Sequence, residues 1–154
     1  MPRYRLRCDN RVLFSVLSAK RGGHTLSVEY QAMFGDDGFA RVFNNVSPLG
    51  NEVPTYKFAG ADERSWQVRH DFAFSSIGAP GLVSTVRYIR GANVDTGRGF
   101  EGEEWVHDLD LGYTFQSGVL KDLGVRVCNV TAGSNYRSDI DESRLIFNYT
   151  WQLL

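Results

Sequence analysis

The chain has 154 residues, a formal net charge of −1 and 42% hydrophobic residues. This length is typical of one domain or of a piece of a larger one. The near-neutral charge and the lack of a Lys/Arg-rich run exclude a strongly basic nucleic-acid binder, and no apolar run approaches the roughly 20 residues of a transmembrane helix.

The composition favours an all-β chain, because sixteen glycines accompany many Val, Tyr, Phe and Thr residues. Residues 1–7 lack the apolar stretch of a secretory signal, so we expect no signal peptide there. Cys8 and Cys128 lie far apart and form no CxxC motif. We expect two unpaired thiols, with a disulfide as the alternative.

Two strands are expected first, at residues 12–19 and 25–31, with a tight turn between them. In the second strand, Leu26, Val28 and Tyr30 alternate with polar residues. A strand repeats every two residues, so this spacing predicts two chemically different faces.

Five further strands show the same alternation. Their apolar positions are Trp66, Val68, His70, Phe72 and Phe74; Leu82, Val86 and Tyr88; Trp105, Leu109, Leu111, Tyr113 and Phe115; Leu123, Val125 and Val127; and Leu145, Phe147, Tyr149, Trp151 and Leu153.

The connections between the seven strands alternate between short and long. Residues 76–81 and 117–122 are short connections, whereas residues 34–64, 92–103 and 133–141 are long and polar. Tight periplasmic turns with longer extracellular loops are typical of outer-membrane barrels. The sequence therefore predicts an all-β, antiparallel transmembrane β-barrel, here an incomplete set of about seven C-terminal strands.

The aromatic residues support this orientation, because amphipathic rings favour the headgroup level of a membrane. The expected extracellular girdle is Tyr30, Trp66, Tyr88 and Trp105, and the periplasmic one is Phe74, Phe115 and Trp151. A soluble β-sandwich binding module, for example for carbohydrate, is the alternative, since hairpins with unequal loops also occur there. His70 and His107 on the apolar face fit the barrel less well.

The opposite face would line a lumen. Its charged residues are Arg69, Asp71, Arg87, Asp108, Asp110, Arg126 and Arg144. Guanidinium groups bind carboxylates at two points, so such rows suit carboxylate-bearing solutes. Alternatively, the arginines and aspartates pair with each other and fill the lumen; both interpretations stay open.

The long segment at residues 34–64 allows two arrangements: it either folds into the lumen or lies exposed, and we expect it to be exposed. His24, His70 and His107 show no metal-ligand spacing, and catalytic constellations are absent. The sequence therefore predicts neither an enzyme nor a cofactor or metal site.

Five segments carry a family resemblance: ERSWQVR at residues 63–69, GAPGL at 78–82, VRY at 86–88, QSGVLKDLGVR at 116–126 and DIDESRLI at 139–146. In this order, from about Asn10 to the end, the chain resembles the OprD family of outer-membrane porins. The resemblance assigns residues 11–154 to the C-terminal portion of such a barrel and leaves residues 1–10 unassigned.

The resemblance implies a substrate-selective channel in the outer membrane of Gram-negative bacteria, with about eighteen strands around an aqueous lumen. It implies passive diffusion of small carboxylate-bearing solutes, such as basic amino acids or aromatic acids, past a ladder of basic residues. Arg126 and Arg144 match ladder positions, and Arg87 and Arg69 lie on matching strands. Such a protein needs a signal peptide for export. Its expected partners are outer-membrane lipid and the barrel-assembly machinery.

The chain departs from the family pattern in three ways. Cys128 stands where the family often has a second arginine, and the chain ends in Leu153-Leu154 rather than in an aromatic residue. Seven strands also do not close a lumen, since the smallest bacterial barrels have eight. We therefore expect either a fragment that needs the remaining strands of a barrel, or a truncated porin remnant without transport activity.

Overall fold

The computed structural model describes residues 9–40 and 49–150. The described residues form seven strands and one short 3-10 turn, and no helix among them is long and apolar enough to cross a membrane. The elements are β1 Arg11–Arg21, β2 His24–Phe34, β3 Arg64–Ala73, η1 Phe74–Ile77, β4 Leu82–Asp95, β5 Glu101–Thr114, β6 Leu123–Ser134 and β7 Ile140–Tyr149.

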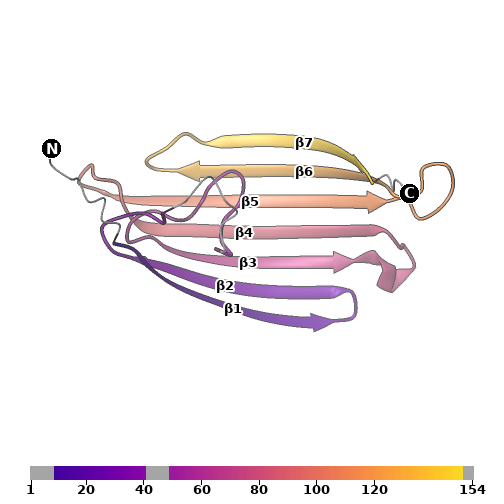
Figure 1. Ribbon diagram of the computed structural model, residues 1–154, viewed down its shortest axis with the longest axis horizontal. Coiled ribbons are helices and arrows are strands. Elements are labelled where there is room, and N and C mark those ends of the chain that lie inside the picture. The colour runs from indigo at the N-terminus through magenta and orange to yellow at the C-terminus, as the bar shows by residue number, and fades with distance from the viewer. Residues whose placement is uncertain (1–8, 41–48, 151–154) are drawn as a thin grey trace, which may run out of the picture.

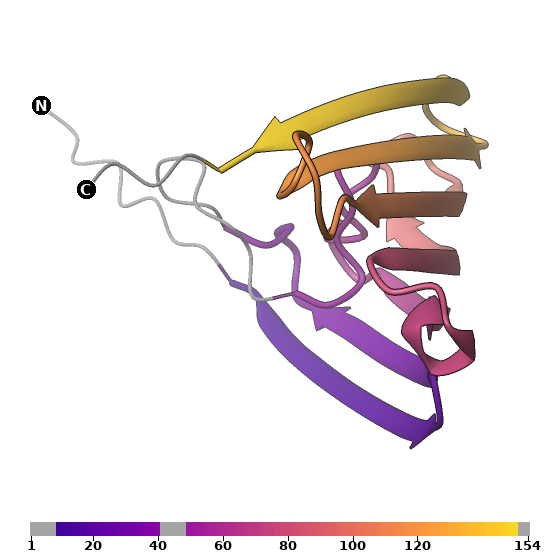
Figure 2. The same ribbon diagram turned by 90° about the vertical axis from the view of Figure 1, so that its right-hand side faces the viewer.

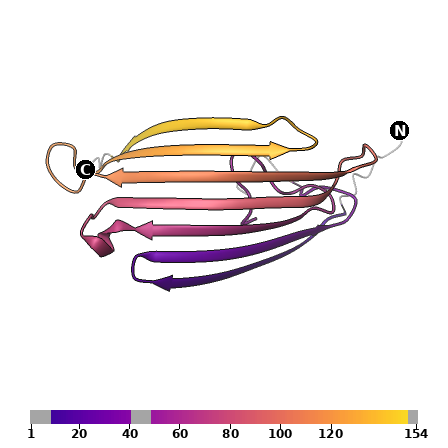
Figure 3. The same ribbon diagram turned by 180° about the vertical axis from the view of Figure 1, so that it is seen from behind.

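All seven strands belong to one antiparallel sheet in the order β1-β2-β3-β4-β5-β6-β7 (Figures 1 and 3). Seen end-on in Figure 2, the sheet curves like a trough and stays open between β1 and β7. Each of these two strands pairs with a single neighbour among the described residues. The predicted antiparallel barrel architecture is confirmed as an incomplete wall. The β-sandwich alternative is wrong, because the described residues contain no second sheet.

The strands are longer than expected at the end that carries the long connections. β4 continues to Asp95 and β5 begins at Glu101, so the expected loop at residues 92–103 shrinks to residues 96–100. At the opposite end, β1 and β2 meet through Gly22 and Gly23 alone. Gly22 has a φ of +58°, which glycine adopts without the steric cost of a Cβ atom.

The register keeps the two faces separate across the whole sheet. Val28 is opposite Val68, and Val68 is opposite Tyr88, so apolar side chains share the convex face. Arg87 is opposite both Arg69 and Asp108 on the concave face. The convex face leaves many large apolar side chains exposed, which is costly in water and suits contact with lipid.

The segment between β2 and β3 folds inward, so our expectation of an exposed loop is wrong. Its described part lies inside the curve of the sheet (Figure 2). Val53, Tyr56 and Phe58 are buried in one apolar cluster with Ile89 of β4 and Val106 of β5. These side chains explain the arrangement, because packing them against apolar residues of the concave face removes both surfaces from water.

Candidate functional site

The predicted path residues Arg69, Arg87, Asp108, Asp110, Arg126 and Arg144 all lie on the concave face, on β3 to β7. Period-two alternation places them there, and the antiparallel register aligns them across the strands. Asp108 is opposite Arg87, and Cys128 is opposite both Asp110 and Arg144.

A pocket of about 140 Å³ lies between this wall and the inward segment. The segment contributes Pro54 and Thr55. The wall contributes Arg87, Asp108, Asp110, Arg126, Cys128, Val130, Arg144 and Ile146. The structure thus brings together five of the six predicted path residues. Arg69 does not line this pocket, and its guanidinium binds Asp71 at 2.8 Å.

The arginines of the pocket are paired with carboxylates. Arg87 Nε lies 3.0 Å from Asp108 Oδ2, and Arg126 donates to Asp110. Arg144 binds Glu142 at two points, with both N–O distances at 2.6 Å. Sequence reasoning missed Glu142, although its place two residues before Arg144 puts it on the same face.

The pairing differs in exposure from one arginine to the next. The side chains of Arg87 and Asp108 are 17% and 11% exposed, whereas the Arg126 side chain is 52% exposed. A guanidinium carries five N–H donors, and the described hydrogen bonds of Arg126 use Nε and Nη2. An exposed guanidinium of this kind can bind a solute carboxylate while it keeps its protein partner.

Cys128 is a buried free thiol in the pocket, and its sulfur lies 3.6 Å from Asp110 Oδ2. Cys8 lies outside the described residues, so the expectation of two unpaired thiols stays a prediction.

Two rows of rings occupy the convex face, one toward each end of the sheet. In the row nearer the long connections, Tyr30 is opposite Trp66, and the Trp66 and Tyr88 rings are 5.3 Å apart. Trp105 lies 5.3 Å from His107, whose ring also contacts Tyr88. His107 therefore belongs to an aromatic row and not to an otherwise aliphatic surface.

The other row contains the predicted residues Phe74 and Phe115. Phe74 packs edge-on against Phe72, and Phe115 packs edge-on against Tyr113. Trp151 lies outside the described residues, so the two complete girdles stay a prediction.

The same end brings together His24 and His70, which the sequence places on different strands. Their nitrogens are 3.0 Å apart, and the His24 ring stacks on Phe72. No group of three or more potential metal ligands occurs in the described part of the chain.

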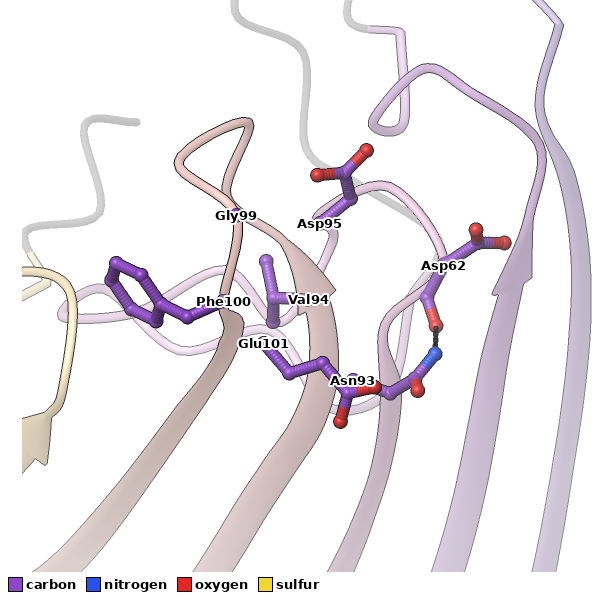
Figure 4. Close-up of a pocket in the computed structure, with 7 residues that line it drawn as sticks. All are labelled: Asp62, Asn93, Val94, Asp95, Gly99, Phe100 and Glu101. Atoms are coloured by element: carbon purple, nitrogen blue, oxygen red, sulfur yellow. Dashed lines mark hydrogen bonds between the residues drawn. The ribbon is translucent and has the colours of Figure 1, made fainter.

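A second pocket, of about 430 Å³, opens at the rim where the inward segment meets the β4–β5 connection (Figure 4). Asn93 donates a 3.0 Å hydrogen bond to the Asp62 carbonyl, and the Asp95 N–H donates to the Ala61 carbonyl. Asn93 has a φ of +64° and lies in the bulge where the β4–β5 register shifts. The bulge thereby fixes the end of the inward segment to the wall.

Comparison with known proteins identifies this architecture. The family model described as outer membrane porin, OprD family, matches residues 5–153. The chain is 40% identical over 150 residues to the porin-like protein GalP of Pseudomonas putida, covering 95% of this chain and 35% of GalP. It is 33% identical to Porin D of Pseudomonas aeruginosa, covering 85% of this chain and 35% of that protein. The chain thus spans about a third of the length of these curated relatives.

Solved structures agree with the sequence comparison. The crystal structure of OpdL from P. aeruginosa superposes with a TM-score of 0.91 at 37% identity, over 96% of this chain and 41% of that chain. That of OccK9 (OpdG) from the same organism gives a TM-score of 0.89 at 44% identity, over 92% of this chain and 37% of that chain. The chain belongs to the OprD family of outer membrane porins.

Proposed function

We propose that the chain forms the C-terminal wall, residues 11–154, of an outer-membrane channel for passive diffusion of small carboxylate-bearing solutes. Basic amino acids and aromatic acids are the expected solutes, and no reaction is catalysed. The observation that carries the proposal is the pocket between the inward segment and Arg87, Arg126 and Arg144. Solutes that pass this point meet guanidinium groups at close range.

The two faces of the sheet then have different surroundings. Outer-membrane lipid surrounds the convex face, with the aromatic rows at the two headgroup levels. Water and solutes fill the concave side. Further strands close the wall by pairing with the free edges of β1 and β7, since lipid cannot satisfy unpaired backbone groups. A signal peptide and the barrel-assembly machinery bring the complete protein to the outer membrane.

The test uses a chimera of GalP in which the stretch that aligns with this chain is replaced by this chain. The GalP chimera is reconstituted in planar lipid bilayers, with GalP itself as the positive control. We expect discrete ion currents that benzoate reduces in a concentration-dependent manner and that neutral benzamide leaves unchanged. If GalP inserts and the chimera yields no channel, the chain does not form this wall.

Arginine variants of the GalP chimera test the solute path. Arg126→Gln and Arg144→Gln should each weaken the effect of benzoate and lower the preference of the channel for anions. Arg90→Gln is the matched control, because Arg90 lies on the convex face, opposite Trp66 and Trp105, and pairs with Glu103. An equal effect of all three substitutions would contradict a path along the concave face.

The open sheet favours a second candidate, a truncated porin remnant without transport activity. The genomic DNA upstream of the Met1 codon distinguishes the two. A continuous porin frame with a signal peptide supports the channel. An interrupted frame supports the remnant.

A further inference from the structure

Two buried carboxyl groups join the inward segment to the wall, away from the arginine pocket. Glu63 is the last residue of the segment before β3, and Glu104 belongs to β5; each is only 1% exposed. The Gly60 N–H donates to Glu63 Oε2 at 2.7 Å. Glu104 Oε2 accepts a hydrogen bond from the Tyr136 hydroxyl and lies 2.9 Å from Arg137 Nη2.

The wall has a space that fits the Glu63 carboxyl group. A Cβ atom at Gly91 of β4 would overlap Glu63 Oε1 and would also lie 2.9 Å from Phe58 Cδ1 and 3.3 Å from Glu104 Cγ. The glycine therefore leaves the room that Glu63 occupies beside Glu104. Oε1 of each glutamate is buried and has no hydrogen-bond partner among the described residues. The two carboxyl groups interact with each other, and two buried carboxyl groups, each with an unpartnered oxygen, are costly unless they share a proton.

The charges around the pair also favour one proton. Arg137 is the cation that faces it, and its guanidinium lies over the rings of Tyr56 and Tyr136 at 4.8 and 4.6 Å. Asp139 lies nearby on the same connection and adds negative charge near Tyr56. Burial, and then the negative charge of Glu104, raises the pKa of Glu63 to about 8. Burial and the Glu104 acceptor also raise the pKa of Tyr136, so this hydroxyl remains a donor.

We propose that Glu63 and Glu104 share one proton and act as positioning residues that hold the inward segment against the wall. In this way they keep Pro54 and Thr55 at the arginine pocket. The inference deepens the proposed function and rests on it, because a narrowed path matters only in a channel. Other contacts hold the segment elsewhere: Gln31 donates to the Phe58 carbonyl at 2.6 Å, and Asn51 donates to Ser65 at 2.8 Å. Of these contacts, only the one between Glu63 and Glu104 contains a carboxyl group that can gain or lose a proton.

The sign of the pH dependence follows from the raised pKa. An exposed Glu63 would titrate near its usual value of 4.5, and the docked one near 8. Docking is therefore strongest at low pH, weakens as the pH rises from about 4.5 to about 8, and changes little above that. The released segment widens the path, so the current through an open channel should rise over the same interval.

The experiment measures single-channel conductance of the GalP chimera between pH 5 and pH 9.5. The starting chimera should show a rise centred below or near pH 8, as a single shared proton requires. Glu63→Gln keeps a hydrogen-bond donor for Glu104 and removes the titrating group. Its conductance should therefore stay at the low-pH level across the range. Gly91→Ala displaces the Glu63 carboxyl group and also meets the Phe58 ring, so it releases the segment and should give the high-pH level throughout.

Glu103→Gln is the matched control. Glu103 is the neighbour of Glu104 on the opposite face, where it pairs with the exposed Arg90. This variant should keep the full pH response. A Glu63→Gln variant that retains the response, or a Glu103→Gln variant that loses it, overturns the proposal. A chimera that conducts with no pH response overturns the proton-sharing pair alone, whereas a chimera without currents overturns the proposed function.

A second measurement reports docking without relying on conductance. Thr55→Cys places a thiol across the arginine pocket from Cys128, in a background in which Cys8 is replaced by Ser. A short bifunctional thiol reagent should link the two cysteines at neutral pH in the starting chimera and in Glu63→Gln. Linking should be slower by about tenfold in Gly91→Ala, if most of its segments are released. Equal linking rates in all variants would contradict the positioning role.

Discussion

The concave face has two halves that differ in environment although one alternation runs through both. Toward the long connections, the inward segment covers the face, and Gln31, Ile89 and Val106 are fully buried. Toward the short turns, Arg126 of β6 and Arg144 of β7 face the arginine pocket, and their side chains are 52% and 41% exposed. The covered half therefore behaves as a protein core and the open half as a wetted wall.

Strand periodicity alone therefore does not define a lumen. Alternation selects a face, and the segment that crosses the face decides which part of it meets water. Hydrophobic burial stabilises the covered half, whereas the open half relies on the mostly buried cross-strand ion pair of Arg87 with Asp108. Substitutions in the two halves should consequently have different effects on the free energy of unfolding and on ion preference.

The largest effect is expected in the covered half, from Phe58→Ala. Phe58 is 0% exposed and packs edge-on against Tyr56 in the apolar cluster. Loss of the ring should lower the free energy of unfolding by about 3–5 kcal/mol. Urea unfolding of the GalP chimera in detergent, followed by tryptophan fluorescence, measures this change.

Leu109→Ala is the control for this prediction. Leu109 lies on the convex face and is 51% exposed. Detergent covers that surface in both the starting and the variant barrel. The free energy of unfolding should therefore fall clearly less than in Phe58→Ala. Equal losses for the two variants would mean that the segment does not form a core with the wall.

Removing an arginine from the open half should lower the free energy of unfolding by an intermediate amount, which depends on how exposed its ion pair is. Arg87→Gln leaves Asp108 without its partner in a mostly buried position, and we expect a loss of about 2 kcal/mol. Arg144→Gln removes an exposed pair with Glu142 and should leave the unfolding midpoint unchanged. The same urea titration compares the two. If Arg144→Gln loses more stability than Arg87→Gln, then the Arg144–Glu142 pair, and not the Arg87–Asp108 pair, is the buried one.

Much of the architecture could be predicted from the sequence. The seven strands and their two faces follow from period-two alternation, because a strand must put Val28 and Glu29 on opposite sides. The six predicted path residues fall on one face for the same reason. The ion-pair partners of these residues are harder to predict. Glu142 lies on the same strand as Arg144, so that pair can be predicted from the sequence, but the pairing of Arg126 with Asp110 requires the strand register.

The inward segment could not be predicted, and the reason is physical. Its polar and glycine-rich composition resembles an exposed loop, and Val53, Tyr56 and Phe58 show no strand or helix period. What draws them inward is Ile89, Val106 and Ala132 on three neighbouring strands. A single strand gives no sign that these side chains form one apolar patch. The carboxyl pair was hidden for the same reason, since Glu63 and Glu104 meet only after the segment has folded.

Cys128→Arg should change ion preference more than stability, and it supplies the arginine that the family resemblance implies at this position. The new guanidinium would lie near Asp110, which already accepts from Arg126, so two cations would share one carboxylate. Their mutual repulsion offsets the added attraction, and Cys128 is buried, so the substitution should not raise the free energy of unfolding. The anion preference should nevertheless increase, because a pore wall selects ions by its net charge. Reversal potentials in a salt gradient measure this preference, and Ile146→Gln serves as an uncharged control in the same pocket. An unchanged reversal potential would place Cys128 outside the proposed ion path and would leave Arg126 and Arg144 as the proposed solute-contacting residues of β6 and β7.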